Sequence, residues 1–451
     1  MVNKNKFMIK NYFKIAWRNL LKRKLYSTIN IFGLSLGIAC SLLLYLFISY
    51  NLSFDRYHKN ASRTYRVLNE LYFGKTLHEK GASIAMFREL SSGLANVSDA
   101  AVILSNYTYT ITVNDSSNAE RRFKEDKSVA LVSPDWFKMF DYKWIAGNPG
   151  QLNLPNTAVI TQKQAEKYFG NSNPIGKIIV FENKQPVTIV GLLSDKPYNT
   201  DLKSDIFVSL SSLKNLSPGT FDGFFSDWGW MNSTTSVYIT LNNIKNKSET
   251  EATINTIAKS NLGDNSKYYH FWLQPLSDVH FNTDYGGEMQ KSLLITLMII
   301  GVLILMIAAF NYINISIAQQ SKRMAEIGTR KVLGGTTWQL FNQFMIETFI
   351  MVSMAVILSV VMVILIFPSA NQFLFSHDPV HLLSYKSIII FLAILLFFLT
   401  FLSGIYPSFV LSRSTKENAG HCSERCRLHT YYLCHCYGFA GTLFEKHRYG
   451  F

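Results

Sequence analysis

The chain has 451 residues, of which 48% are hydrophobic and only 16% are charged, a charged fraction that is low for a soluble globular protein. Its mean hydropathy is only +0.10, which excludes a chain that is apolar throughout, so apolar blocks must alternate with a water-facing part. The formal net charge of +14 suits either nucleic acid or a membrane surface, and the positions of the charges decide between these two classes.

The basic charge is concentrated at the start of the chain, directly before an apolar block. Residues 1–24 contain no acid and the following basic residues: Lys4, Lys6, Lys10, Lys14, Arg18, Lys22, Arg23 and Lys24. Lys and Arg stay on the cytoplasmic side of membrane spans. We therefore interpret residues 1–24 as a cytoplasmic basic amphipathic segment that meets the lipid bilayer, and we expect no nucleic acid partner.

Four uncharged stretches are long enough to cross a bilayer, which takes roughly 20 apolar residues. The predicted transmembrane helices are 25–54, about 292–317, about 347–367 and about 387–411. The third ends at Phe367, before Pro368. The predicted fold is thus an α-helical membrane protein with four transmembrane helices and a mixed α/β extracytoplasmic domain, residues 55–291, inserted between helices 1 and 2.

The loop charges predict the orientation of these spans. The loop after the second span holds Lys322, Arg323, Arg330 and Lys331 against Glu326 alone, so we place it in the cytoplasm. Residues 55–291 and 368–386 then lie outside, and the chain after residue 412 lies inside.

The inserted domain shows strand, helix and turn signals. Residues 157–161 and 187–192 have strand character, 163–169 form a short amphipathic helix ended by Gly170, and 173–176 form a turn. No cysteine lies between Ser41 and Gly420, so the domain has to fold on its own apolar core and not on disulfides.

Catalytic signals are weak. Gly74-Lys75-Thr76 resembles the end of a phosphate-binding loop, but Asn69 stands where the first glycine belongs. His58, His270 and His280 are isolated in the sequence, and we expect them to be structural or solvated. We predict no enzyme activity, no cofactor and no metal site for this chain.

The segment 414–451 is atypical. It holds most of the cysteines, Cys422, Cys426, Cys434 and Cys436, close to several histidines. The spacing fits no usual zinc finger, and the composition changes abruptly after Arg413. We interpret the tail as the product of a reading-frame change, with metal binding as the alternative.

The stretch between spans two and three carries the strongest functional pattern. Residues 321–335 read as a short basic helix, about 321–333, stopped by Gly334-Gly335. Met324, Ile327 and Lys331 share one face of that helix. This pattern favours docking to an acidic cytoplasmic partner, and the alternative is an ordinary positively charged loop.

Several motifs together resemble one family, the ABC transporter permeases of the MacB/FtsX type. The N-terminal segment 8–20 with 29–34 looks like the start of such permeases, and Glu326–Lys331 with Gly334 resembles their coupling-helix motif. Residues 133–137, 168–170 and 173–177 resemble their periplasmic core domain, and 402–407 resemble the end of their last span.

The resemblance implies a MacB-like core domain at 55–291 and an FtsX-like permease domain at 292–413. It implies a permease subunit in the inner membrane that couples ATP hydrolysis by a separate cytoplasmic ABC ATPase to movement of the periplasmic domain, for export or efflux. A permease homodimer or pseudo-dimer and a periplasmic adaptor are further partners to expect. The residues assigned to the ATPase-coupling helix are Arg323, Met324, Glu326, Ile327, Gly328, Arg330, Lys331 and Gly334.

Two points stay open at the level of the sequence. Many similar permeases repeat the whole unit, so this chain is either a natural four-span unit or part of a longer permease. A membrane-bound sensor with a periplasmic ligand domain is the alternative function, although the loop after the second span is too short for a signalling domain.

The orientation is testable with truncated reporter fusions. A fusion after Asn199 should be active outside the cytoplasm, and a fusion after Thr336 should be active inside, because the positive-inside rule assigns these positions to opposite sides. Alkaline phosphatase and a fluorescent protein report the two sides. The opposite pattern would overturn the orientation.

Overall fold

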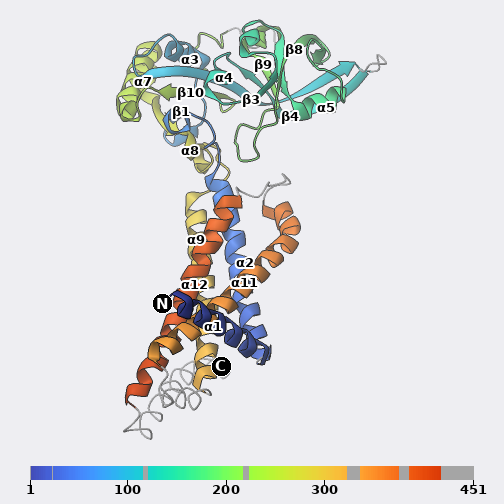
Figure 1. Cartoon of the computed structure of the whole chain (residues 1–451). Helices are drawn as coiled ribbons and strands as arrows, with labels where there is room; N and C mark the ends of the chain where they lie inside the picture. The colour runs from blue at the N-terminus through green and yellow to red at the C-terminus, as the bar shows by residue number, and fades with distance from the viewer. Residues whose placement is uncertain are drawn as a thin grey trace, which may run out of the picture. The chain divides into compact units, whose positions relative to one another are not determined.

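The computed structural model describes residues 2–22, 24–114, 120–216, 223–321, 336–374 and 385–417 (Figure 1). The chain divides into two compact units. Unit 1 comprises Met1–Phe47 and Leu297–Phe451, and unit 2 comprises Ile48–Thr296.

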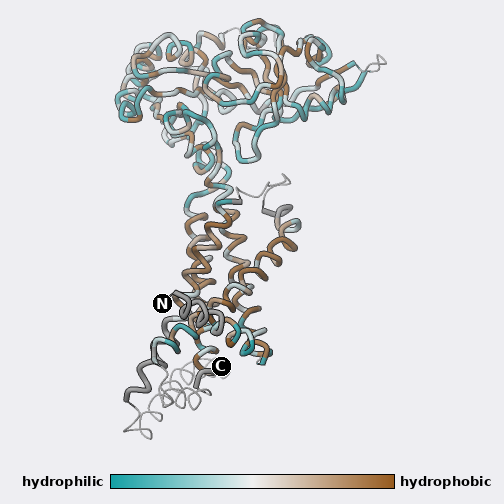
Figure 2. The backbone as a smooth tube through the Cα atoms, viewed as in Figure 1, coloured by the Kyte–Doolittle hydropathy of each residue, from teal (hydrophilic) through white to brown (hydrophobic). Residues whose placement is uncertain are grey.

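Long helices make up the described part of unit 1, and all of them except the basic amphipathic α1 are apolar. They are α1 (Val2–Lys22), α2 (Lys24–Leu52), α9 (Lys291–Ser321), α11 (Thr337–Leu374) and α12 (Tyr385–Glu417). Among the residues that the structure describes, three stretches are long and apolar enough to span a bilayer, at Lys24–Leu52, Lys291–Ala318 and Phe341–Ala370, and their hydrophobic colouring is evident in Figure 2. A helix satisfies all of its interior backbone groups itself, which the lipid interior requires.

The fourth predicted span falls on α12. Within the described residues, its apolar stretch runs from Lys386 to Leu402 and is shorter than the other three. The count of four spans therefore stays a prediction.

The predicted end of the third span at Phe367 is corrected by α11, which continues through Pro368 to Leu374. Proline removes one backbone N–H and crowds the preceding turn. Membrane helices tolerate this, because neighbouring groups re-satisfy the freed carbonyl.

The helices of unit 1 approach closely where side chains are small. A Cβ atom placed on Gly37 of α2 would lie 2.7 Å from the Cβ of Ala308 in α9, so glycine is what permits this contact. In another cluster of unit 1, Ala16 and Leu20 of α1 pack with Ile350 and Met351 of α11.

Unit 2 contains one eleven-stranded mixed sheet. Its central order is β11-β1-β10-β3-β4-β9-β6-β8-β5, with β2 paired to β1, and β7 paired to β3 and β8. The strands are β1 (Thr64–Tyr72), β2 (Thr76–Glu79), β3 (Val97–Asn114), β4 (Glu120–Val132), β5 (Trp144–Ala146), β6 (Thr157–Thr161), β7 (Ile178–Phe181), β8 (Gln185–Leu193), β9 (Ile206–Ser209), β10 (Thr235–Leu241) and β11 (Tyr269–Pro275). The pairs β4–β9 and β6–β8 are parallel.

Both faces of this sheet are buried, because side chains alternate along each strand. In β3, Ala100, Val102 and Leu104 enter one core, whereas Ala101 and Ile103 enter the other. Helices cover the two faces. The helices of unit 2 are α3 (Ile84–Ser91), α4 (Trp136–Met139), α5 (Gln162–Phe169), α6 (Leu213–Leu216), α7 (Lys247–Leu262) and α8 (Leu276–Val279).

The first core receives side chains of α3, α5 and α7, and the second receives side chains of α4 and α8. The edge strand β11 is fixed by α7, because the Asn255 side chain donates to the Phe271 carbonyl at 2.7 Å and accepts from its N–H at 3.0 Å. This contact also places α8, which follows β11 directly.

The predicted local elements of this unit are confirmed. Residues 157–161 are strand β6, residues 187–192 lie in β8, and α5 ends before Gly170, whose φ is +59°. Gly74-Lys75-Thr76 lies at the turn of the hairpin between β1 and β2, and not between a strand and a helix, where a phosphate-binding loop would lie.

A buried carboxylate holds α5 to the sheet. Oε1 of Glu125 in β4 accepts hydrogen bonds from Gln164 at 2.8 Å, Lys167 at 2.6 Å and Tyr168 at 2.7 Å. We predict that Glu125→Ala lowers the free energy of opening of β4 and α5 by about 2–3 kcal/mol, because it leaves buried donors unpaired. Hydrogen exchange of the full-length protein in detergent measures this. The control is Glu166→Ala, which removes an exposed glutamate of α5 and should change little.

Candidate functional site

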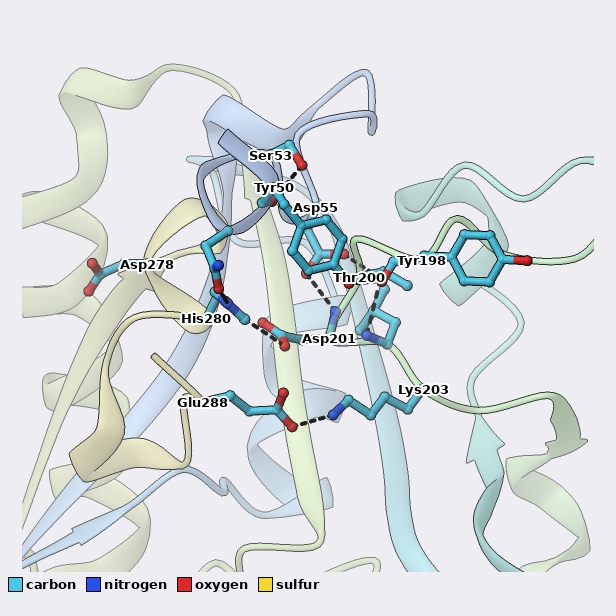
Figure 3. Close-up of polar contacts among 12 residues, drawn as sticks. Tyr50, Ser53, Asp55, Tyr198, Thr200, Asp201, Lys203, Asp278, His280 and Glu288 are labelled. Carbon is cyan, nitrogen blue, oxygen red and sulfur yellow. Dashed lines mark hydrogen bonds and ion pairs between the residues drawn. The ribbon is translucent and has the colours of Figure 1, made fainter. Parts of the chain in front are cut away.

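A group of polar side chains lies in unit 2 where three segments of the chain meet (Figure 3). The segments are the chain after α2, the loop between β8 and β9, and the chain between α8 and α9. We call the group the polar joint, and it consists of Asn51, Asp55, Tyr57, Thr200, Asp201 and His280. Asn51, Asp55, Thr200 and His280 are buried.

The turn after α2 is tied to the β8–β9 loop by the backbone. Asp55 has a φ of +52°, a left-handed conformation that Asp tolerates better than most residues. Its N–H donates to the carbonyl of Asn199 at 3.0 Å, and the Asn199 amide donates to the carbonyl and hydroxyl oxygens of Ser53 at 3.0 and 2.9 Å. The Tyr50 hydroxyl donates to the carbonyl of Tyr198 at 3.0 Å.

The carboxyl group of Asp55 makes the central contacts of the joint. Its Oδ1 accepts a hydrogen bond from the Thr200 hydroxyl, and its Oδ2 accepts one from the N–H of Asp201 at 3.1 Å. Burial raises the pKa of Asp55 to about 7, the Thr200 hydrogen bond opposes this rise, and the nearby Asp201 carboxylate adds to it. Near neutral pH the group therefore exists in both protonation states.

His280 connects the third segment. Its Nδ1 lies 3.1 Å from Oδ1 of Asp201, and its Nε2 lies 3.0 Å from Oδ1 of Asn51. The ring also stacks on Phe54, with 3.6 Å between the ring centroids. One imidazole thus bridges the end of α2 and the β8–β9 loop.

A second histidine lies beside the joint. Nδ1 of His58 accepts a hydrogen bond from the N–H of Asp141 at 3.0 Å, and the Tyr57 hydroxyl donates to Thr200 at 3.4 Å. Burial lowers the pKa of His58 to about 4, with the Asp141 carboxylate opposing this. His58 is therefore neutral at pH 7, and its 3.9 Å approach to the Asp141 carboxylate is not an ion pair there.

Two ion pairs lie at the solvent-exposed rim. Lys203 of the β8–β9 loop pairs with Glu288, and Lys291, the first residue of α9, pairs with Asp278 of α8. Exposed pairs of this kind contribute roughly 0–1 kcal/mol each. The buried joint therefore stabilises the arrangement, and the rim pairs add little.

The joint holds its three segments together and has no evident catalytic chemistry. Within the described ranges, no group of three or more His, Cys, Asp or Glu side chains is placed to hold a metal ion. Most polar groups of the joint satisfy one another, whereas Oδ2 of Asp201 is buried without a hydrogen-bond partner. What can change is the protonation of Asp55.

The predicted coupling-helix residues lie at 323–334, outside the described residues, and so does the tail from residue 418 onward. His58 and His280 are structural, as predicted, since both are buried and hydrogen-bonded to acidic residues far along the chain. His270 is exposed, as expected. The only sequence signal for the joint was Asp55, the first charge after the uncharged stretch 25–54.

Two protein families match the chain. The MacB-like periplasmic core domain matches residues 27–257, and the FtsX-like permease C-terminal domain matches residues 298–416.

Curated relatives agree with these matches. An uncharacterised ABC transporter permease, YknZ of Bacillus subtilis strain 168, is 27% identical over 216 residues, which is 47% of this chain and 47% of the relative. The macrolide export ATP-binding/permease protein MacB of Shewanella sp. strain W3-18-1 is 24% identical over 251 residues, which is 53% of this chain and 36% of the relative. The chain thus spans less than half the length of these two relatives.

Among solved structures, the periplasmic region of MacB from Actinobacillus actinomycetemcomitans is similar at 16% identity, with a TM-score of 0.36. The match covers 49% of this chain and 91% of that one.

The joint predicts two opposing pH dependences. The pKa of Asp55 is raised from 3.8 to about 7 on folding, so its contribution to stability is lost as pH rises through that window. The pKa of His58 is lowered from 6.5 to about 4, so its contribution is lost as pH falls through that window. In the wild type the two slopes largely cancel between about pH 4 and 6.5.

We predict that single variants expose the two slopes. In Asp55→Asn only the His58 contribution is left, so the free energy of opening of the joint should rise by about 3 kcal/mol between about pH 4 and pH 6.5. In His58→Gln only the Asp55 contribution is left, so the same free energy should fall by about 4 kcal/mol between about pH 4 and pH 7. Hydrogen exchange of β8, β9 and α8 in the full-length protein, corrected for intrinsic rates, measures both. Parallel slopes in the two variants would contradict the assignment.

Proposed function

Because the chain belongs to the family of ABC transporter permeases with a MacB-like periplasmic core domain and an FtsX-like permease domain, we propose that it works with an ATPase carried on a separate cytoplasmic chain. We place the protein in the inner membrane as a four-span subunit, with residues 55–291 in the periplasm, and the reaction it serves is export or efflux.

The polar joint is the observation that carries the proposed mechanism. The chain enters unit 2 directly from α2 and leaves it directly into α9. Both connections are bound to the same β8–β9 loop, through Asp55 on one side and His280 on the other. A displacement of either connection therefore acts on β8 and β9, which are interior strands of the sheet.

This arrangement supports mechanotransmission. In the proposed cycle, ATP binding and hydrolysis move the transmembrane helices, and the joint passes that movement to the periplasmic domain. A loosely attached domain would absorb the displacement in its linkers. Buried hydrogen-bonded groups resist being pulled apart, because their separation leaves polar atoms without hydrogen-bond partners.

The ATPase is proposed to dock on the basic segment at about 321–333. Arg323, Arg330 and Lys331 supply positive charge, and Met324 and Ile327 supply an apolar anchor. Rim ion pairs contribute roughly 0–1 kcal/mol each, whereas a fully buried Ile contributes about 1.5–3 kcal/mol. Ile327 is therefore the residue whose replacement should matter most.

We predict that Ile327→Asp separates the permease from its ATPase. The change removes the anchor and places a carboxylate where it would be desolvated. Co-purification of the ATPase with the tagged full-length chain should fall at least about tenfold, and permease-dependent ATP hydrolysis should fall with it. Membrane abundance should stay at the wild-type level, since the position lies outside the predicted spans.

Two further variants set the scale of this test. Lys331→Ala should change little, because it removes a single rim charge. Arg330→Glu combined with Lys331→Glu should weaken capture in a salt-dependent way. If Ile327→Asp keeps full partner binding and coupled hydrolysis, the segment is an ordinary charged loop and the coupling assignment fails.

A further inference from the structure

A groove of about 470 Å³ lies between α1 and α11 in unit 1. Its volume is within the roughly 300–1,000 Å³ typical of ligand sites. Phe13, Lys14 and Trp17 of α1 line one side, and residues of α11 that include Phe349, Ser353 and Ile357 line the other. The lining is apolar apart from Lys14 and Ser353.

The groove exists because the apolar face of α1 is wider than its contact with α11. Ala16 and Leu20 are buried in that contact. Phe13 and Trp17 lie on the same helix face, at neighbouring positions of the helical repeat, yet they remain 43% and 50% exposed. Two large aromatic side chains are thus left beside the contact with nothing from unit 1 covering them fully.

The α11 side of the groove leads into the membrane. Phe349, Ser353 and Ile357 are spaced four residues apart, so they form a stripe about 12 Å long that is nearly parallel to the helix axis. Phe349 and Ile357 are 41% and 66% exposed. All three residues belong to the span Phe341–Ala370. A ligand that follows this stripe has to be apolar, because it enters the lipid interior.

The α1 end of the groove is basic. Lys14 lines it, and Arg18 and Lys22 follow at four-residue intervals on the same side of the helix. The sequence of α1 contains no acid. Trp17 beside Lys14 is also typical of the boundary between lipid and water. A ligand with an apolar chain and an anionic head complements both ends of the groove.

We propose that the groove binds one acyl chain of an anionic phospholipid, with Lys14 beside its phosphate. The lipid comes from the leaflet on the side of the N-terminus. A zwitterionic phospholipid offers the same chain and phosphate but adds a cation next to a basic helix, so it should bind more weakly. The inference is independent of ATPase coupling.

Native mass spectrometry of the full-length protein in detergent tests the lipid selectivity. We expect one dioleoyl phosphatidylglycerol to bind roughly tenfold more tightly than dioleoyl phosphatidylcholine. Lys14→Glu should reduce phosphatidylglycerol binding roughly tenfold. The matched control is Lys24→Glu, which makes the same charge change at the exposed first residue of α2, outside the basic row of α1, and should have a much smaller effect. Equal affinity for both lipids, or equal effects of the two variants, would overturn the proposal.

A photoreactive amino acid at Ile357 tests the occupant in an otherwise wild-type chain. This exposed position tolerates a larger side chain. Illumination in vesicles that contain phosphatidylglycerol should yield a crosslink to that lipid, and Ser353→Trp should abolish the crosslink by filling the groove. The control is Val361→Trp, an exposed position one turn further along α11 that does not line the groove. A crosslink to a second copy of the chain, or an undiminished lipid crosslink with Ser353→Trp, would contradict the assignment.

Discussion

The passage of the chain from lipid to water is the constraint on which the rest of the structure depends. In the lipid interior every backbone polar group has to be satisfied within its own helix, so the spans are long, uncharged and apolar. Once the chain leaves α2 this restriction ends, and Asp55 follows at once as the first charged residue. The carboxyl group of this first charged residue binds the β8–β9 loop.

The sheet of unit 2 gives that loop its fixed position. Strand β9 is buried on both faces, and β8 is buried on one face and half-buried on the other. Strand β6 lies between them, paired in parallel with β8 and antiparallel with β9. The loop between β8 and β9 is therefore held at both ends by paired strands. Its residues Thr200 and Asp201 contact Asp55 after α2 and His280 after α8. On the other side, α7 fixes β11, β11 places α8, and His280 follows α8 directly. The β8–β9 loop and His280 are therefore both positioned by the packing of the sheet and its helices, and not by the hydrogen bonds of the joint itself.

Burial at this position has an electrostatic consequence. The environment that excludes water from the joint also raises the pKa of Asp55 to about 7, while it lowers the pKa of His58 to about 4. The protein accepts a carboxyl that is poised between two charge states at the point where its membrane connections are attached. A fully apolar contact would avoid that cost, but it would lack the directional hydrogen bonds that set the relative positions of the three segments.

The sequence by itself determined the elements whose signals are local. Hydropathy identified three long apolar stretches that are helical in the structure, and strand and turn patterns identified β6, β8 and α5, because those patterns depend on residues close together in the chain. The end of α11 was missed, since a membrane helix can continue through a proline such as Pro368. Only the tertiary structure decided the joint, where Asp55 meets Thr200 across 145 residues and His280 meets Asp201 across 79. Such pairs depend on the order of strands in the sheet, and no local pattern around an isolated histidine encodes that order.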